Sequence, residues 1–114
     1  FEIDCDRYLT YKIDETVYDI EYRLEGSEDV TINVIQYKTN DDGGSSLVSF
    51  SDEDEVHKYT SEIYKLKQRN TYILVYATGG SSSSTLKAQI IKNAELAKEY
   101  TRTGTELGIE LGLP

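Results

Sequence analysis

The octapeptide VYDIEYRL at residues 17–24 decides the fold class, because apolar and charged side chains alternate along it. Successive side chains of a β-strand point to opposite faces, which separates the charged members of this octapeptide from the apolar ones. The apolar set is Tyr18, Ile20, Tyr22 and Leu24. The pattern therefore predicts a strand with one buried face and one solvated face.

The same period continues after a polar turn at residues 25–29. Val30, Ile32 and Val34 alternate there with Thr31 and Asn33. Two alternating blocks separated by a short Gly-containing turn are typical of a β-hairpin. We therefore expect residues 17–24 and 30–34 to form adjacent antiparallel strands.

Further strand-like blocks recur along the chain, at residues 8–13, 47–50, 56–63, 71–76 and 85–91. The block at 71–76 is apolar on both faces, which favours a central position in its sheet. The segment 79–84, Gly-Gly followed by four serines, is interpreted as a mobile hairpin tip. About seven short strands at this spacing predict an all-β fold, an antiparallel β-sandwich.

The C-terminal part has a different composition. Asn93 is a plausible N-cap, and residues 94–100 are good helix formers. We therefore predict a sandwich domain over 1–92, followed by a short helical segment and tail over 93–114. Few packing signals follow about residue 103, so trimming that segment is expected to leave the thermal stability nearly unaltered.

Composition excludes several classes of protein. The chain has 114 residues, a net charge of −9 and 38% hydrophobic residues, which is too apolar for a disordered acidic tail and suits one domain. Its acidity disfavours nucleic-acid backbones and anionic membrane surfaces, since both attract clustered Lys and Arg. No apolar run approaches the ~20 residues that a bilayer requires, so no membrane insertion is expected in this segment.

The chain contains no Met and begins at Phe1. We interpret it as a processed or excised piece of a longer protein, with the secretory pathway or an extracytoplasmic compartment slightly favoured. No pattern in the sequence specifies an oligomeric state.

Catalytic chemistry has few candidates. His57 is the single histidine, and Cys5 lies between Asp4 and Asp6, whose negative charge disfavours a reactive thiolate. The chain is therefore predicted to be non-enzymatic, with no catalytic residue and no cofactor.

Calcium is the one metal that the sequence suggests, and only weakly. Oxygen-rich loops carry the candidate ligands Asp41, Asp42, Asp52 and Asp54. The first loop lacks the full spacing of a calcium-binding loop. Alternatively, these acids keep the neighbouring strand edges soluble.

Ten tyrosines without any tryptophan provide candidates for recognition, because Tyr combines a large ring with a polar hydroxyl. Four of them alternate within strand blocks and are interpreted as core or sheet-face residues: Tyr18, Tyr22, Tyr72 and Tyr76. Three others are predicted to contact a protein partner: Tyr37, Tyr59 and Tyr64.

Two stretches resemble the GOLD domain, the small β-sandwich of Golgi-dynamics and p24-type cargo proteins. They are TVYDIEYRLEGSEDVTINVI at 16–35 and NTYILVYATGGSSSSTLKAQII at 70–91. The resemblance implies a non-catalytic protein-interaction module of a larger protein, attached to membrane-trafficking or lipid-binding partners. The strand order is also similar to prepeptidase-type accessory sandwiches of secreted proteins, which implies a carbohydrate-binding or calcium-supported accessory domain as the alternative.

Overall fold

The computed structural model describes residues 16–113, without the side chains of Asp52 and Gln68. The expected strand at 8–13 and Cys5 lie outside the described residues. The described residues form nine strands and two 3-10 turns: β1 (Tyr18–Gly26), β2 (Val30–Lys38), β3 (Ser45–Ser49), η1 (Asp52–Asp54), β4 (Lys58–Thr60), β5 (Tyr64–Leu66), η2 (Gln68–Asn70), β6 (Tyr72–Gly79), β7 (Thr85–Lys92), β8 (Glu95–Thr103) and β9 (Glu106–Gly112).

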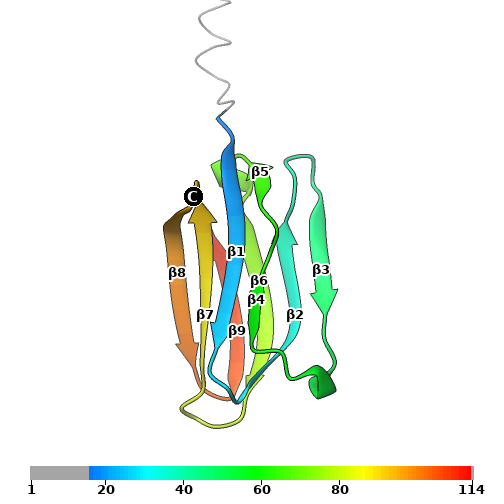
Figure 1. Cartoon of the computed structure of the whole chain (residues 1–114), viewed down its shortest axis with the longest axis vertical. Coiled ribbons are helices and arrows are strands. Elements are labelled where there is room, and N and C mark those ends of the chain that lie inside the picture. The colour runs from blue at the N-terminus through cyan, green and yellow to red at the C-terminus, as the bar shows by residue number, and fades with distance from the viewer. Residues whose placement is uncertain (1–15, 114) are drawn as a thin grey trace, which may run out of the picture.

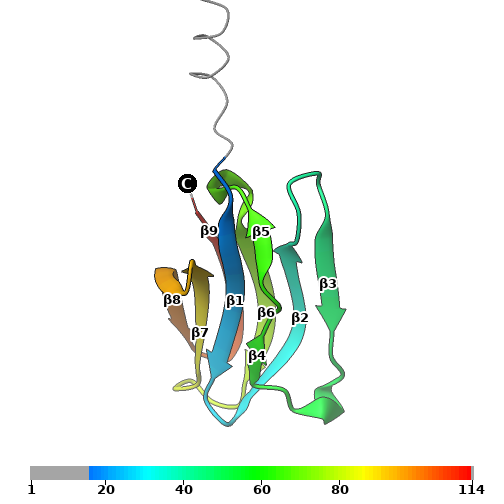
Figure 2. The same ribbon diagram turned by 45° about the horizontal axis from the view of Figure 1, so that its top comes forward.

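The strands form two antiparallel sheets that pack face to face (Figures 1 and 2). Sheet A has the order β4-β1-β7-β8, with β5 also paired to β1, and sheet B has the order β3-β2-β6-β9. The predicted all-β sandwich is confirmed. The block at 71–76 lies in β6, between β2 and β9, as its two apolar faces indicated.

The core lies between the inner faces of the sheets. In β1, Ile20, Tyr22 and Leu24 are 0–2% exposed, while the charged side chains between them face solvent. Other fully buried side chains lie on the inner faces of the other long strands, among them Ile32, Ile35, Ile73, Leu86, Ile90 and Leu107. Burial of these apolar surfaces is the main force that holds the two layers together.

The first two strands are not a hairpin, so the predicted adjacency of 17–24 and 30–34 is wrong. β1 pairs with β4, β5 and β7 in sheet A, whereas β2 pairs with β3 and β6 in sheet B. Both strands bury one face, and a connection between sheets preserves that pattern as well as a hairpin does. The chain turns at Gly26, where an added Cβ would lie 2.8 Å from the Cβ of Val30.

Three more connections cross between the sheets at the same end of the sandwich: β3 to β4, β6 to β7 and β8 to β9 (Figure 1). Backbone hydrogen bonds join two of them. The N–H of Gly79 donates to the carbonyl of Thr105 over 2.9 Å, and the N–H of Gly104 donates to the carbonyl of Ser84 over 2.9 Å. The serine segment 79–84 is therefore an inter-sheet connection held by its neighbours, and its interpretation as a mobile hairpin tip is wrong.

The predicted C-terminal helix is also wrong, because residues 95–103 form β8. Asn93 and Ala94 have φ angles of 52° and 67°, and they make the two-residue turn of the β7–β8 hairpin. Asn93 is fixed by two bonds to Asp19: its N–H donates to the Asp19 carbonyl over 2.8 Å, and its Oδ1 accepts from the Asp19 N–H over 2.9 Å. A tertiary contact thus overrides the helix propensity of this segment.

The last strand completes sheet B. Leu107, Ile109 and Leu111 of β9 are at most 5% exposed. The division at residues 92 and 93 therefore does not separate a sandwich from a tail, and the segment after residue 103 packs into the core.

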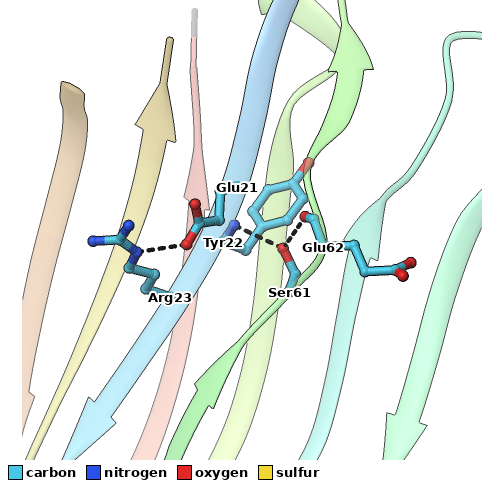
Figure 3. Close-up of polar contacts among 5 residues, drawn as sticks. All are labelled: Glu21, Tyr22, Arg23, Ser61 and Glu62. Carbon is cyan, nitrogen blue, oxygen red and sulfur yellow. Dashed lines mark hydrogen bonds and ion pairs between the residues drawn. The ribbon is translucent and has the colours of Figure 1, made fainter. Parts of the chain in front are cut away.

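The predicted single strand over 56–63 is interrupted. β4 ends at Thr60, β5 begins at Tyr64, and Ser61 lies between them with its side chain against β1 (Figure 3). The Tyr22 N–H donates to Ser61 Oγ over 2.9 Å, and the Ser61 N–H donates to the Tyr22 carbonyl over 2.9 Å. Ser61 Oγ in turn donates to the Glu62 carbonyl over 2.7 Å, so this hydroxyl satisfies backbone groups at the break.

Candidate functional site

The outer face of sheet A is charged, and its charges are largely paired. Figure 3 shows the ion pair of Arg23 and Glu21. Its Nε and Oε2 atoms lie 2.7 Å apart, and the pairs Lys65–Asp19, Lys87–Glu99 and Lys58–Glu25 have distances of 2.8, 3.7 and 3.8 Å. Exposed ion pairs of this kind contribute little to stability, because water and salt screen them. Their main effect here is to keep this face hydrophilic.

Two shallow hollows lie on the outer face of sheet A, with volumes of about 330 and 380 Å³. The first is lined in part by Asp19, Glu21 and Arg23, whose charges already have partners in the ion pairs above. The second includes His57, which is half-buried. A nucleophile–base pair requires a hydrogen bond between the two side chains. Within the described residues, the His57 ring makes no such bond to a serine.

The outer face of sheet B is apolar by comparison. We define the apolar face as four residues on three neighbouring strands: Val34, Leu47, Leu74 and Tyr76. Val34 lies directly opposite Tyr76, and Gln36 lies between Leu47 and Leu74 in the next row of the sheet. Leu47 is 67% exposed and Tyr76 49% exposed, so large apolar side chains stand in solvent here.

A β-bulge places Val34 on this face. The register of β2 against β6 shifts between Ile32 and Val34, which inserts Asn33 as an extra residue. Strict alternation predicts Val34 on the buried side with Ile32. The bulge instead turns Val34 outward and directs Ile35 into the core at 0% exposure. The adjacent pair Val34-Ile35 is the break in alternation that could have revealed it.

The margin of the apolar face along β9 is acidic. Glu110 lies opposite Leu74, and Glu106 lies opposite Thr78. Between these glutamates, Gly108 lies opposite Tyr76, and an added Cβ there would meet no atom within 4 Å. The Tyr76 ring therefore has open space beside it on the face.

The predicted contact residues lie elsewhere, in an internal aromatic cluster. The Tyr37 ring centre lies 4.9 Å from that of Tyr22, 5.9 Å from that of Tyr64 and 6.1 Å from that of Tyr59. Tyr37 is 3% exposed, and its hydroxyl lies 2.7 Å from the Tyr59 hydroxyl. Tyr59 and Tyr64 are half-buried and pack against the core, so the three rings support the sandwich, and a contact of Tyr59 or Tyr64 with a partner stays a prediction.

Burial within this cluster disfavours the charged phenolate. Desolvation, followed by the contact with Tyr37, raises the pKa of Tyr64 to about 12. Desolvation also raises the pKa of Tyr37 and Tyr22 above the ordinary value of a phenol. The cluster is therefore built for neutral side chains.

The calcium candidates are not brought together. Asp41 and Asp42 lie in the β2–β3 loop and Asp54 lies in η1, at opposite ends of β3 (Figure 1), while the side chain of Asp52 is outside the described structure. Asp41 accepts hydrogen bonds from the Asn70 side chain at 2.7 Å and from the Lys67 N–H at 3.0 Å, and these bonds lower its pKa. Among residues 16–113, no three His, Cys, Asp or Glu residues gather closely enough to hold a metal ion.

No protein-family model matches the chain, and no curated protein matches it. In the part of the chain that the structure describes, none of the helical segments has the length and hydrophobicity to cross a bilayer.

Proposed function

We propose that this domain is a non-catalytic protein-interaction module of a larger protein, and that it binds its partner through the apolar face. The observation that carries the proposal is the difference between the two outer faces: the charges of sheet A are largely paired with one another, whereas Leu47 and Tyr76 of sheet B are 67% and 49% exposed. Clustered exposed apolar side chains mark interaction surfaces, whereas isolated ones do not.

The composition of the apolar face fits a protein interface. Interface centres are enriched in Tyr and depleted of charge, with a polar rim. Tyr76 and Leu74 lie at the centre of the sheet on β6, and the charged side chains Glu106 and Glu110 lie on the neighbouring strand β9. The exposed phenol of Tyr76 can bury its ring and still bond a partner through its hydroxyl.

The charge of the chain favours a different protein over a second copy. Two copies carrying −9 each repel one another, and a twofold contact through this face would also bring Glu106 and Glu110 of both copies close together. We therefore propose a partner whose surface is apolar at its centre and carries Lys or Arg at its margin.

The resemblance to GOLD domains supports the same class of function. If it holds, the partner belongs to a membrane-trafficking or extracytoplasmic assembly. The stretches that carry it, 16–35 and 70–91, supply β1, β2, β6 and β7 of the sandwich. Fold-level likeness of this kind favours a class of role and leaves the partner to be found by experiment.

Site-specific photo-crosslinking of the full-length protein in its native host tests the proposal. A benzophenone amino acid is placed at Tyr76, and as a matched control at Tyr100 of β8, which is equally exposed at 50%. We expect one protein to crosslink at Tyr76 and not at Tyr100, and its affinity to fall about tenfold for Tyr76→Ser, as for an aromatic interface residue. Equal labelling at both positions, or unchanged affinity, contradicts the proposal.

The alternative, a carbohydrate-binding or calcium-supported accessory domain, is an outcome of a second measurement. Titration calorimetry with calcium and with a glycan panel reports both ligands directly. Saturable glycan binding that Tyr76→Ser abolishes would replace the protein partner by a sugar, since an exposed aromatic ring on a flat sheet also suits a sugar ring.

A further inference from the structure

Among the described residues, β3 is an outer strand of sheet B and pairs with β2 alone (Figures 1 and 2). Hydrogen bonds at its two ends fix the direction of its backbone groups: the Thr39 N–H donates to the Gly44 carbonyl, and the Phe50 N–H donates to the Asn33 carbonyl. In an antiparallel pair, the backbone N–H and C=O groups of every second residue point towards the neighbouring strand, so those of residues 44, 46, 48 and 50 point towards β2. The N–H and C=O groups of Ser45, Leu47 and Ser49 therefore face away from the sheet.

This edge lacks the usual protection. Exposed edges are normally guarded by charged side chains, Pro or bulges, because their open backbone groups can pair with another strand. The five residues of β3, SSLVS, include neither charge nor Pro. Among the described strands at sheet edges, β4, β5, β8 and β9 all carry charged residues.

The opposite edge of sheet B is covered by its neighbour. Lys98 of β8 donates to the Gly112 carbonyl over 2.9 Å, and Arg102 of β8 donates to the Gly108 carbonyl over 3.0 Å. Two carbonyls of β9 are thus occupied by side chains of the other sheet. Among the described residues, the contrast identifies the β3 edge as the open edge of sheet B.

Acidic segments bracket β3 at both ends. Asp41 and Asp42 precede it, and the run Asp-Glu-Asp-Glu at 52–55 follows it. A second copy of β3 paired antiparallel would bring residues 41–42 of one chain near residues 52–55 of the other, and parallel pairing would bring each acidic run beside its own copy. Both arrangements oppose like charges, which disfavours self-pairing.

We propose that β3 receives an extended segment of a partner protein as an added strand, and that this segment has a neutral, β-forming centre of about five residues flanked by Lys or Arg. The inference rests on the proposed function, of which it names the binding mode. Main-chain hydrogen bonds supply affinity in strand addition, while side chains supply selectivity. Leu47 contributes its backbone to the edge and its side chain to the apolar face, so the added strand would extend that face.

Synthetic peptides test the charge and strand requirements. The probe is Lys-Lys-Thr-Val-Thr-Val-Thr-Lys-Lys, and its two controls carry Glu in place of Lys, or Gly-Ser-Gly-Ser-Gly in place of the central five residues. We expect saturable binding of the probe, with amide hydrogen exchange slowed at Ser45, Leu47 and Ser49. Binding about tenfold weaker is expected for each control, because one loses charge complementarity and the other loses β-propensity. Equal binding of the Gly-Ser control would mean that charge alone attracts the peptide, and would overturn the inference.

Substitution at Ser49 tests the edge itself. Ser49→Pro removes one outward N–H and leaves the bonds to β2 in place, since Ser49 does not donate to β2 in this register. We expect the probe to bind about tenfold more weakly to Ser49→Pro and unchanged to Ser49→Thr, with an intact β2–β3 exchange pattern in both. Equal affinity for the two variants would overturn strand addition at β3.

The outcomes separate this inference from the proposed function. Tyr76→Ser is expected to leave the affinity for the probe unchanged within about twofold, because residue 76 does not contribute to the edge. If the peptide binds but no protein crosslinks at residue 76, the apolar face is not the docking surface, and strand addition at β3 is still supported. If a protein crosslinks at residue 76 but the peptide does not bind, the apolar face is supported as the docking surface, and strand addition at β3 is contradicted.

Discussion

The hydroxyl of Ser84 donates a hydrogen bond of 2.6 Å to the carboxylate of Asp29, which lies 55 residues earlier in the chain. Asp29 also accepts from the hydroxyls of Ser27 at 2.8 Å and Ser81 at 3.3 Å, and its carbonyl accepts the N–H of Gly80. One acid in the β1–β2 turn thereby organises the β6–β7 connection. Hydrogen bonds to the charged form of a carboxylate stabilise that form.

The first prediction concerns acid stability. The bonds from Ser84 and Ser27 hold the pKa of Asp29 below its ordinary value, which in the unfolded chain is about 3.9. A group whose pKa is lower in the folded state stabilises the fold above the unfolded pKa, and this contribution is lost as the pH falls through the folded pKa. The melting temperature of Asp29→Asn should therefore fall less steeply than that of the wild type below about pH 4.

Melting temperatures measured from pH 6 to pH 2 check this prediction, with Glu28→Gln as the control for removal of one neighbouring charge. The Glu28→Gln curve should run parallel to that of the wild type. If the Asp29→Asn curve does so as well, the serine contacts do not contribute in solution.

The second prediction concerns the β7–β8 turn. Ala94 has a φ angle of 67°, a left-handed conformation that glycine adopts without the steric cost of a Cβ. Ala94→Gly should raise the free energy of unfolding by roughly 1 kcal/mol. Ala97→Gly in β8 should instead lower it by roughly 0.5–1 kcal/mol, because glycine weakens a strand interior. Denaturant titration of both variants measures the difference, and a destabilised Ala94→Gly would contradict the turn geometry.

The third prediction compares two glycines of sheet B. A Cβ added at Gly79 would clash with the Gly104 carbonyl and would lie 2.6 Å from the Ser84 Cβ, whereas one added at Gly108 meets nothing within 4 Å. Gly79→Ala should therefore destabilise the fold by about 1–3 kcal/mol, the usual cost of overpacking. Gly108→Ala should be neutral or slightly stabilising. Similar melting temperatures for the two variants would show that the inter-sheet connection yields easily.

The fourth prediction concerns alkaline pH. The pKa of Tyr64 is raised to about 12, above the ordinary value of about 10 for an unfolded tyrosine. A raised pKa means that the neutral phenol stabilises the fold below pH 10, and that this contribution is lost as the pH rises towards 12. Phenolate absorbance and circular dichroism should thus change together above about pH 10. The transition should move to lower pH in Tyr37→Phe, which loses the bond to Tyr59.

The fifth prediction concerns the last strand. Leu107 is completely buried, so Leu107→Ala should cost about 2–5 kcal/mol of unfolding free energy. Glu106→Ala, one residue earlier on the exposed face, should change it by less than about 0.5 kcal/mol. Equal effects would indicate that the segment after residue 103 does not pack, as the sequence had suggested.

The long strands could be predicted because the alternation of apolar and polar side chains indicates which face of each strand is buried. The partners of those strands could not be predicted. β1 and β2 bury one face each whether they pair or cross between sheets, and their partners β7 and β6 lie far along the chain. The sequence predicted Asn93 as a helix cap, because a local pattern does not show its bonds to Asp19, which join distant parts of the chain.

The candidate site was missed for a related reason. Val34 belongs to the apolar face through the bulge at Asn33, and Tyr76 was assigned to a buried or sheet-face role by strand type alone. Tyr37, by contrast, was predicted as a contact because a tyrosine combines a large ring with a polar hydroxyl, yet its ring lies among three other tyrosines. Exposure of an aromatic ring depends on which strands stack above it, and a single sequence does not record that.

The four inter-sheet connections at one end of the sandwich have a consequence for how the chain folds. Ile20 of sheet A pairs with Lys92, and Ile73 of sheet B pairs with Leu111, so both sheets contain pairings that join distant parts of the chain. Non-local pairing of this kind slows folding to roughly milliseconds or seconds, because the chain loses the entropy of loop closure before the stabilising contacts form. During synthesis, sheet B cannot be completed before β9 leaves the ribosome. Until then the part of the core that Leu107, Ile109 and Leu111 fill stays open to solvent, and exposed apolar surface of this kind makes a partly synthesised chain prone to aggregation.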